Sequence, residues 1–525
     1  MNVGTAALGP RGLGHLRLRW GQRGGVVVVS AAGGEGPQFG TETHHVSAKC
    51  RETCTVTIAR IQTSFARKAV HQPEHRFCDL YSLLCSRAWI EAALGQVLSN
   101  RGSRTAGVDG VTVQRFEDPD YRAAFVEETQ RLLRERRYRP QPCRRVYIPK
   151  AGGKRRPLGI PTLRDRVVQM ELKMLLEPIY ESDFLGCSYG FRPGRRTMDA
   201  VSQLWSYIQP SLKFYWIVEG DIRGCFDTIS HHKLMGLLKR RVGDRDILDL
   251  VWMFLKAGIM EEGAARPTEM GTPQGGIFSP LLANVCLHEM DRFWWEQYVA
   301  LPKHRKRDRR QAGGGSVRLL RYADDFVLLW NGTKQGAYAL KERFATFLRD
   351  ELHLELSAEK TLVTHADEGF DFLGFHARRC QDYGKPALIV WPSRKSVQRL
   401  KNEVRALTDR AMLSWGAESL VTRLNLYLRG WGYYFRYCSI SRLASSLDRF
   451  VWGRVFYWLC KKHGCGPRRT WVQYVKRVGG RSVLAVPRQE GGLLPVAFLR
   501  DIKVRRYPRL HRIPHPYLVA GSQLG

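Results

Sequence analysis

The clearest feature of the hydrophobic pattern is a pair of short apolar stretches on either side of two adjacent acids. Residues 317–320 and 326–330 are rich in β-branched and aromatic side chains, and Asp324 and Asp325 lie between them. Runs of this length and composition are typical of strands, so the pattern predicts a β-hairpin with two carboxylates in or beside its turn. A second strand-like stretch, residues 214–221, also ends in an acid.

Carboxylates at the ends of neighbouring strands suit hard divalent cations. Burying two of them is costly unless their charge is neutralised, and carboxylate oxygens are ligands that Mg²⁺ and Mn²⁺ prefer. Asp221, Asp324 and Asp325 together supply the acids that a two-metal phosphoryl-transfer site needs, with its ions about 4 Å apart. For an Asp-Asp pair alone, a turn with two solvated acids is the commoner explanation, and the third acid shifts the balance towards a metal site.

Apolar residues at helical spacing predict helices before and after these strands. The expected helices cover residues 77–98, 125–137, 165–180, 281–295, 336–352, 394–407, 420–434 and 447–459. We expect Pro178 to end the third of them, and Ser393 to cap the sixth. Residues 147–161 predict a further β-hairpin, whose tip carries the cations Lys150, Lys154, Arg155 and Arg156.

The stretch Tyr322-Ala323-Asp324-Asp325 resembles the catalytic box of reverse transcriptases. Further stretches follow the order of one branch of that class, namely residues 148–162, 188–195, 221–227, 271–280 and 372–375. The ordered set, which spans about residues 75–470, resembles the reverse transcriptase and maturase proteins encoded within group II introns. This resemblance implies an α+β right-hand polymerase fold, with fingers and palm followed by a helical thumb known as maturase domain X.

The resemblance and the composition divide the chain into four expected parts. Residues 1–72 are rich in Gly and Arg without sustained periodicity, and we expect a disordered or leader segment there. Residues 73–385 would form fingers and palm, and residues 390–465 a thumb of three helices. We expect residues 466–525 to be a basic tail that binds nucleic acid. We expect no endonuclease there, because no Cys follows Cys465.

The resemblance also implies an active site with two Mg²⁺ ions, for which Mn²⁺ could substitute. Asp221, Asp324 and Asp325 are the expected catalytic residues and metal ligands, with help from the backbone carbonyl of Ile222. We rank Asp227 below Asp221 as a ligand and expect it in a turn or cap.

Other residues are expected to hold nucleotide and nucleic acid, since cations offset the charge that builds up on the triphosphate. The substrate-binding candidates are Lys154, Arg156, Phe226 and Gln274. Among them, Phe226 resembles the steric gate that excludes a ribose 2′-hydroxyl. The nucleic-acid-binding candidates are Lys150, Arg155, Arg192, Arg195 and Arg429, and Lys360 could meet phosphate or Asp324. Each of these residues also has an ordinary alternative, such as a solvated hairpin end, core packing or a plain turn.

The charge balance agrees with a polyanionic partner. Lys and Arg number 84 against 49 Asp and Glu, a formal net charge of +35, which points to nucleic acid bound largely through phosphates. The 12 Cys are scattered without a clear metal-binding double pair, so we expect free thiols rather than a disulfide framework. We expect no membrane association, because no apolar run approaches the length of a membrane span.

We therefore interpret the chain as an RNA-directed DNA polymerase that also binds its intron RNA, assisting splicing and mobility (retrohoming). The expected partners are group II intron RNA, a DNA target and primer, and deoxynucleoside triphosphates. A homodimer is also possible. We expect a bacterial cytoplasmic ribonucleoprotein rather than an organellar one. Two alternatives are an RNA-binding splicing factor without polymerase activity and a reverse transcriptase that serves host defence.

Overall fold

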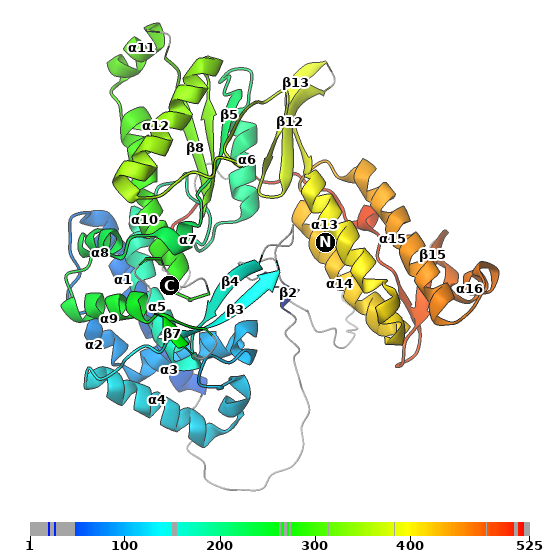
Figure 1. The fold of residues 1–525 in the computed structure, drawn as a ribbon, viewed down its shortest axis with the longest axis horizontal. Coiled ribbons are helices and arrows are strands. Elements are labelled where there is room, and N and C mark those ends of the chain that lie inside the picture. The colour runs from blue at the N-terminus through cyan, green and yellow to red at the C-terminus, as the bar shows by residue number, and fades with distance from the viewer. Residues whose placement is uncertain are drawn as a thin grey trace, which may run out of the picture. The chain divides into compact units, whose positions relative to one another are not determined.

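The computed structural model describes residues 48–149, 155–261, 264–266, 270–271, 275–312, 314–382, 384–478, 480–508 and 513–518, together with two short strands near the N-terminus. The chain forms two units (Figure 1). The larger contains the described residues from 48 to 389 and from 507 to 518, and the smaller contains those from 390 to 506 together with the two N-terminal strands. Each unit is described separately below.

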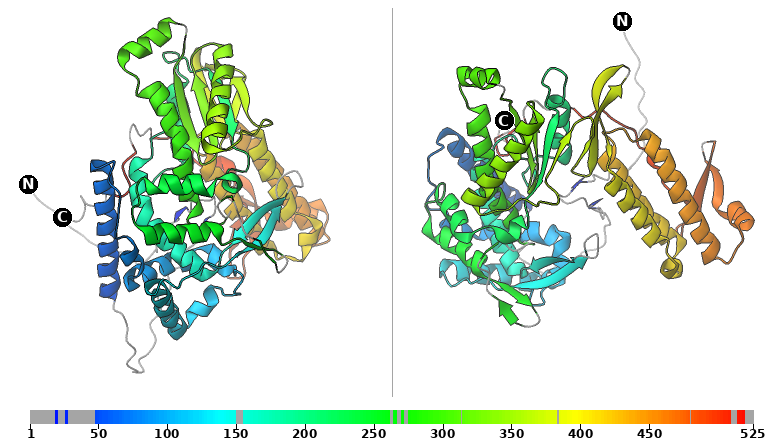
Figure 2. Two further views of the ribbon diagram at one scale, coloured as in Figure 1. Left: turned by 60° about the vertical axis from the view of Figure 1, so that its left-hand side comes forward. Right: turned by 45° about the horizontal axis from the view of Figure 1, so that its top comes forward.

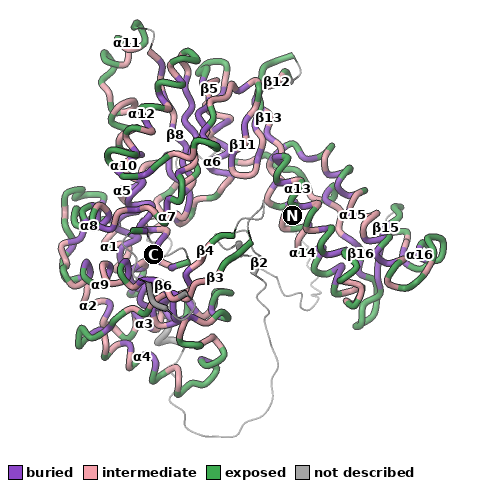
Figure 3. Tube along the Cα trace, in the orientation of Figure 1, coloured by how far each residue is buried: buried purple, intermediate pink, exposed green. Residues whose placement is uncertain are grey.

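The larger unit is mostly helical by residue count. Its helices are α1 (Ala48–His71), α2 (Tyr81–Leu84), α3 (Arg87–Ser99), η1 (Arg101–Arg104), η2 (Val113–Glu117), α4 (Pro119–Arg134), α5 (Leu163–Asp183), α6 (Thr197–Tyr207), α7 (Cys225–Thr228), α8 (His231–Lys239), α9 (Arg245–Lys256), α10 (Ser279–Trp294), η3 (Trp295–Val299), α11 (Lys303–Gln311) and α12 (Lys334–Leu352). Helix α5 lies deep in the core, since buried residues occur all round it (Figure 3).

Three sheets complete this unit. One has the strand order β10-β5-β9-β8, the second β4-β3-β6-β7, and the third β11-β12-β13. The strands are β3 (Cys143–Pro149), β4 (Arg155–Ile160), β5 (Trp216–Asp221), β6 (Ile259–Glu261), β7 (Ala264–Arg266), β8 (Val317–Tyr322), β9 (Asp325–Trp330), β10 (Leu362–His365), β11 (Phe370–Phe372), β12 (Phe375–Asp382) and β13 (Lys385–Pro392), the last of which runs into the smaller unit. Helices α6, α10 and α12 pack on the first sheet, so the predicted mixture of helices and sheets is confirmed.

The smaller unit joins a helical bundle to a small antiparallel sheet of order β14-β15-β16. Its elements are α13 (Arg394–Leu407), η4 (Arg410–Ser414), α14 (Ala417–Phe435), α15 (Ser441–Lys462), α16 (Pro467–Tyr474), β14 (Val475–Val478), β15 (Arg481–Pro487), β16 (Leu493–Pro495) and η5 (Leu499–Asp501). The hydroxyl of Ser393 accepts a hydrogen bond from the Ser396 amide at 3.2 Å, which caps α13. The remaining strands, β1 (Arg19–Trp20) and β2 (Val26–Val27), pair with each other.

Three expectations need correction. Residues 48–71 form helix α1 rather than part of a disordered segment (Figure 2), because buried alanines at positions 66 and 69 let it pack closely on α5. Helix α5 passes through Pro178 and ends at Asp183. Residues 467–501 are not a simple tail, because α16 and β14–β16 pack on α14 and α15.

The hydropathy of the helices bears on membrane association. Within the described residues, no helix combines the length and apolar character needed to cross a bilayer.

Helix α5 also carries a buried acid without a partner. Glu171 is fully buried, and neither of its carboxylate oxygens has a hydrogen-bond partner among the described residues. Burial raises the pKa of Glu171 well above its usual value near 4.5, so the folded protein holds this side chain neutral. A buried polar group without a hydrogen bond costs about 1–3 kcal/mol.

We expect Glu171→Met to stabilise the larger unit by about 1–3 kcal/mol, because it removes that cost at similar volume. The gain should widen as the pH rises above about 4.5, since the unfolded chain then releases a proton that folded Glu171 retains. Thermal unfolding at several pH values measures both effects. Glu177 on the same helix accepts a hydrogen bond from the Tyr517 hydroxyl at 2.7 Å, so Glu177→Met should be destabilising. A Glu171→Met variant with a lower melting temperature would contradict this account.

Candidate active site

Strand register brings the three predicted acids together. Strands β5 and β9 are antiparallel, with Asp221 directly opposite Asp325, and β8 joins β9 through a two-residue turn made of Ala323 and Asp324. Directly opposite residues in antiparallel strands have Cα atoms about 5 Å apart. Ala323 adopts φ of +59°, an uncommon conformation for a side chain other than glycine, and this tight turn places Asp324 beside the other two acids.

Two glycines allow the surrounding chain to approach these acids closely. A Cβ atom at Gly220 would lie 2.1 Å from the Phe326 ring, so the ring covers the β5 backbone beside Asp221. A Cβ atom at Gly190 would lie 2.3 Å from the Ala323 amide nitrogen. A side chain at Gly220 would therefore displace the Phe326 ring, and one at Gly190 would displace the turn at Ala323.

A buried ion pair anchors the β8–β9 hairpin to helix α10. The Arg321 guanidinium donates to both carboxylate oxygens of Asp291 on α10, at 2.8 and 2.6 Å, and both residues are fully buried. Arg321 also donates to the Asn284 side chain at 2.9 Å and to the Ala323 carbonyl in the turn at 3.1 Å. One guanidinium thus links the turn to helix α10.

The same network secures the segment that follows α5. The Asn284 side chain donates to the Gly190 carbonyl at 2.9 Å, and the Tyr189 amide donates to the Arg321 carbonyl at 2.8 Å. Burial lowers the pKa of nearby His288 to about 4, so this ring is neutral near pH 7. The charge of Asp291 is therefore balanced by Arg321.

The three acids repel one another, and Lys360 offsets part of that repulsion. Loss of hydration, followed by the charges of Asp324 and Asp221, raises the pKa of Asp325 to about 7, although Asp325 keeps exposed surface. Desolvation also raises the pKa of Asp324. The Lys360 ammonium donates to Asp221 at 2.5 Å, and this hydrogen bond raises the pKa of Lys360. A cation thus already lies where the negative charge is concentrated.

The donor set fits a divalent cation by its chemistry. Three carboxylates from β5, β9 and the turn before β9 supply the oxygen ligands that hard cations require, and loss of hydration raises the pKa of both Asp324 and Asp325. As they stand, however, no three His, Cys, Asp or Glu side chains of the described residues form a cluster that could hold an ion. Because Lys360 is paired with Asp221, metal binding would have to displace that lysine.

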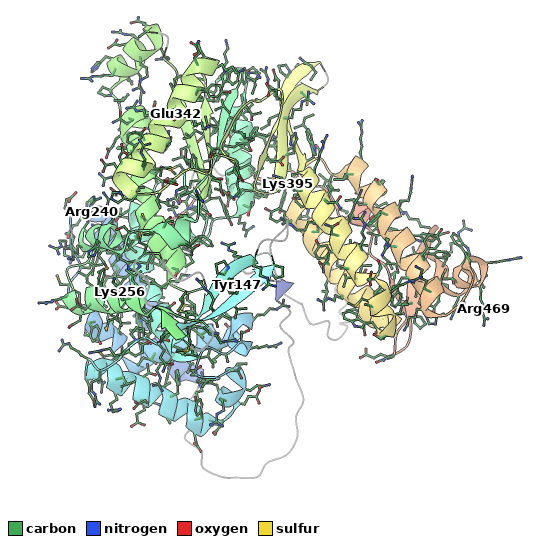
Figure 4. The ribbon with its side chains drawn as sticks, viewed as in Figure 1. Tyr147, Arg240, Lys256, Glu342, Lys395 and Arg469 are labelled. Carbon is green, nitrogen blue, oxygen red and sulfur yellow. The ribbon has the colours of Figure 1, made fainter. Side chains whose placement is uncertain are left out.

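The β3–β4 hairpin brings further cations into the larger unit. Arg155 and Arg156 are exposed on β4, across from residues 148–149 of β3. Strand β3 also carries Tyr147, whose side chain is half-exposed (Figure 4). The positive charge of Arg156 acts to lower the pKa of Asp324, so this arginine lies near enough to the acids to interact with them electrostatically. Lys150, Lys154 and Gln274 lie outside the described residues.

The prediction that Arg192 binds nucleic acid is wrong. Its guanidinium is buried, donates to both carboxylate oxygens of Glu181, and reaches the carbonyls of Phe184, Leu185 and Ser188. All five N–H donors are thereby used within the protein, which leaves none for a phosphate.

The remaining candidates differ in exposure. Arg195 is largely buried between Glu181 and the Tyr189 ring, a position that does not favour a phosphate contact. Phe226 on α7 is half-buried and packs edge-on against Phe191, with ring centroids 6.1 Å apart. Among the rest, Ile222 is buried beside Asp221, Asp227 is exposed on α7, and Arg429 is exposed on α14 of the smaller unit.

Sequence reasoning missed the residues that position the site. Arg321 interrupts an apolar strand, and a charged residue in such a run is a signal for a buried ion pair. Its partners Asn284 and Asp291 lie seven residues apart on α10, two helical turns, which places both on one face.

Comparison with known proteins gives the site its context. Residues 148–377 match the family model described as reverse transcriptase (RNA-dependent DNA polymerase), and residues 397–476 match the group II intron, maturase-specific domain. The chain is 35% identical to protein YkfC of Escherichia coli over 379 residues, an alignment that covers 68% of this chain and 98% of YkfC. It is 34% identical to group II intron-encoded protein LtrA of Lactococcus lactis over 348 residues, which cover 58% of this chain and 57% of LtrA.

A more distant similarity extends to an intron protein of yeast. The putative COX1/OXI3 intron 2 protein of Saccharomyces cerevisiae is 26% identical over 54% of this chain and 37% of its own length. The acid-bearing sheet and the two family models define a reverse transcriptase, a class that requires a divalent metal ion, joined to a maturase domain. The chain belongs to the family of reverse transcriptase and maturase proteins encoded by group II introns.

We expect Asp291→Ala to destabilise the larger unit by about 3–5 kcal/mol, because it leaves the buried charge of Arg321 without a partner. Urea or thermal unfolding measures the change. Glu289 on the same helix pairs with the half-exposed Arg240 (labelled in Figure 4) and Arg292, so Glu289→Ala should cost less than about 1 kcal/mol. Equal losses for the two variants would argue against a special role of the buried pair.

Proposed function

We propose that the larger unit copies RNA into DNA with Asp221, Asp324 and Asp325 as the ligands of two Mg²⁺ ions. The observation that carries the proposal is the register of β5 and β9, which sets Asp221 against Asp325 with Asp324 in the adjoining turn. When bound, the ions would activate the primer 3′-hydroxyl and neutralise the departing pyrophosphate. The backbone carbonyl of Ile222 is a further candidate ligand, because it follows Asp221 directly.

The protein groups around the acids would position the substrates. Arg156 would face the triphosphate, since its charge already acts on Asp324, and Lys154 and Gln274 are proposed to complete the nucleotide pocket. Lys360 would leave Asp221 when metal binds and turn to the phosphates. Arg155 and Lys150 would hold the template from the same hairpin. Positioning and charge compensation account for most of the acceleration in such reactions.

We assign the units to a right-hand polymerase on the strength of the family matches. The β3–β4 hairpin with the helices before it would be the fingers, the sheet β10-β5-β9-β8 the palm, and α13–α15 the thumb. The thumb overlaps the maturase-specific match at residues 397–476, which supports intron RNA as its partner. The DNA target and primer, the deoxynucleotides and a role in retrohoming from a bacterial ribonucleoprotein are proposed by analogy with LtrA, of which the alignment covers 57%.

Asp324→Ala should abolish cDNA synthesis on a primed RNA template while retaining assistance to intron splicing, because only the polymerase needs the acid. Primer extension with Mg²⁺ measures the first activity, and splicing of the flanking intron RNA measures the second. Asp249→Ala removes an exposed acid of α9 whose partner is the exposed Arg245, and it should keep both activities. Full cDNA synthesis by Asp324→Ala would refute the assignment of the site. If the wild type makes no cDNA, the result would favour the alternative of an RNA-binding splicing factor without polymerase activity.

Phe226→Val should increase incorporation of ribonucleotides relative to deoxynucleotides by at least about tenfold, because the smaller side chain leaves room for the 2′-hydroxyl. Single-nucleotide primer extension with matched ribo- and deoxynucleotides gives the ratio of kcat/KM. Phe191→Leu serves as the control, since it removes the edge-on contact with Phe226 but keeps the gate. An unchanged ratio in Phe226→Val would show that the ring only packs.

A further inference from the structure

The smaller unit contains a cavity of about 730 Å³. Its lining is strongly basic, with Arg429, Arg436, Arg481, Lys503 and Arg505 against the single acid Asp501. Cavities of about 300–1,000 Å³ are typical of sites for small ligands. The excess of positive charge indicates a ligand that carries negative charge.

Buried polar side chains of the bundle hold in place the chain segment that forms one wall of the cavity. Asn425 on α14 donates to the Pro495 carbonyl at 2.8 Å and accepts from the Ala497 amide at 2.7 Å. Asp448 on α15 accepts from the Leu499 amide at 2.7 Å and the Arg500 amide at 3.1 Å. Both side chains are buried, so the segment from β16 to η5 is fixed before any ligand arrives.

The same segment also approaches α14 closely. A Cβ atom at Gly432 would lie 2.1 Å from the Ile502 side chain and 3.2 Å from that of Leu499. The glycine therefore lets η5 and the chain after it lie directly against the helix. That contact brings Lys503 and Arg505 beside Arg429 of α14 and beside Arg436, which directly follows the helix.

The charges in the cavity are mostly uncompensated. Arg481 pairs with Asp501 at 2.8 Å, but no carboxylate of the described residues pairs with Arg429, Lys503 or Arg505. Arg436 stacks over the rings of Tyr433 and Tyr437, at 5.6 and 5.0 Å from their centroids. Its Nε is buried without a hydrogen-bond partner among the described residues.

Aromatic rings lie among these cations. Tyr433 is 41% exposed at the cavity, and Phe498 contributes a second ring to the lining. Cations combined with exposed rings are typical of proteins that bind unpaired nucleotides, since the cations bind phosphate while the rings stack on bases. An acidic peptide would use the cations but not the rings, and a duplex keeps its bases out of reach.

We propose that this cavity binds an unpaired nucleotide of a single-stranded RNA, with its base on Tyr433 and its phosphates at Arg429 and the neighbouring cations. The inference rests on the proposed binding of intron RNA by the smaller unit and names a specific site for it. It predicts that the maturase unit selects RNA with unpaired residues over duplex RNA.

Fluorescence titration of the full-length protein with a short single-stranded RNA containing 2-aminopurine tests the site. Stacking on Tyr433 should quench the probe. Tyr433→Ala should weaken binding about tenfold and abolish quenching, while Tyr433→Phe should retain both. Arg429→Ala should lower the slope of log affinity against log salt by about 0.7, as expected for one lost phosphate contact to a single strand.

Arg469→Ala is the charge-matched control, because Arg469 is exposed on α16 and does not line the cavity (Figure 4). It should leave quenching intact, and thermal unfolding checks that every variant is folded. If Tyr433→Ala quenches like the wild type, or if duplex RNA or polyglutamate competes as well as single-stranded RNA, the inference fails although RNA binding stands. If the wild type shows no quenching, the site is also refuted, while cDNA synthesis by the same sample tests the polymerase separately.

Discussion

The active site depends on one buried interaction, the paired hydrogen bonds between Arg321 and Asp291. Removing two charges from water is costly, and such a pair stabilises a protein little compared with apolar residues of the same size. What it provides here is position. The guanidinium has a fixed planar fork, and it holds the turn carbonyl of Ala323 and helix α10 in a single geometry. A turn held only by apolar packing would be freer to shift.

This rigidity matters because the three acids in and beside the turn repel each other. Without an anchor, the hairpin could relax by moving Asp324 and Asp325 away from Asp221, whereas the strand register holds Asp325 directly opposite Asp221. Lys360 compensates from the solvent side, where its side chain is 56% exposed. The anchor is thus buried and permanent, whereas the compensating cation is exposed and exchangeable. That division suits a site that must bind and release ions and pyrophosphate during each cycle.

The sequence predicted the parts of this site that depend on local pattern. The strands beside Asp324 and the strand that ends at Asp221 could be recognised from short apolar runs, and the convergence of their acids was expected from the needs of a two-metal site. Interactions between distant segments were beyond such reasoning. Arg192 and Arg321 look alike as arginines beside known motifs, and only the fold shows that Glu181 and Asp291 consume their donors. Helix α1 was missed because only a few of its residues, among them Ile58, Ala66 and Ala69, are buried, and polar and charged residues make up much of the rest.

The smaller unit uses the same physical principle in another form. Asn425 and Asp448 are buried polar side chains whose partners are backbone groups of a segment about 50 to 70 residues later in the chain. Because a buried polar group without its partner is costly, the segment from β16 to η5 cannot detach without exposing them or leaving them unsatisfied. The bundle and the chain that follows it therefore form one structure, and the basic side chains after η5 are held at fixed positions. A flexible basic tail would attract RNA of any shape, whereas cations fixed around a cavity can distinguish one arrangement of phosphates and bases from another.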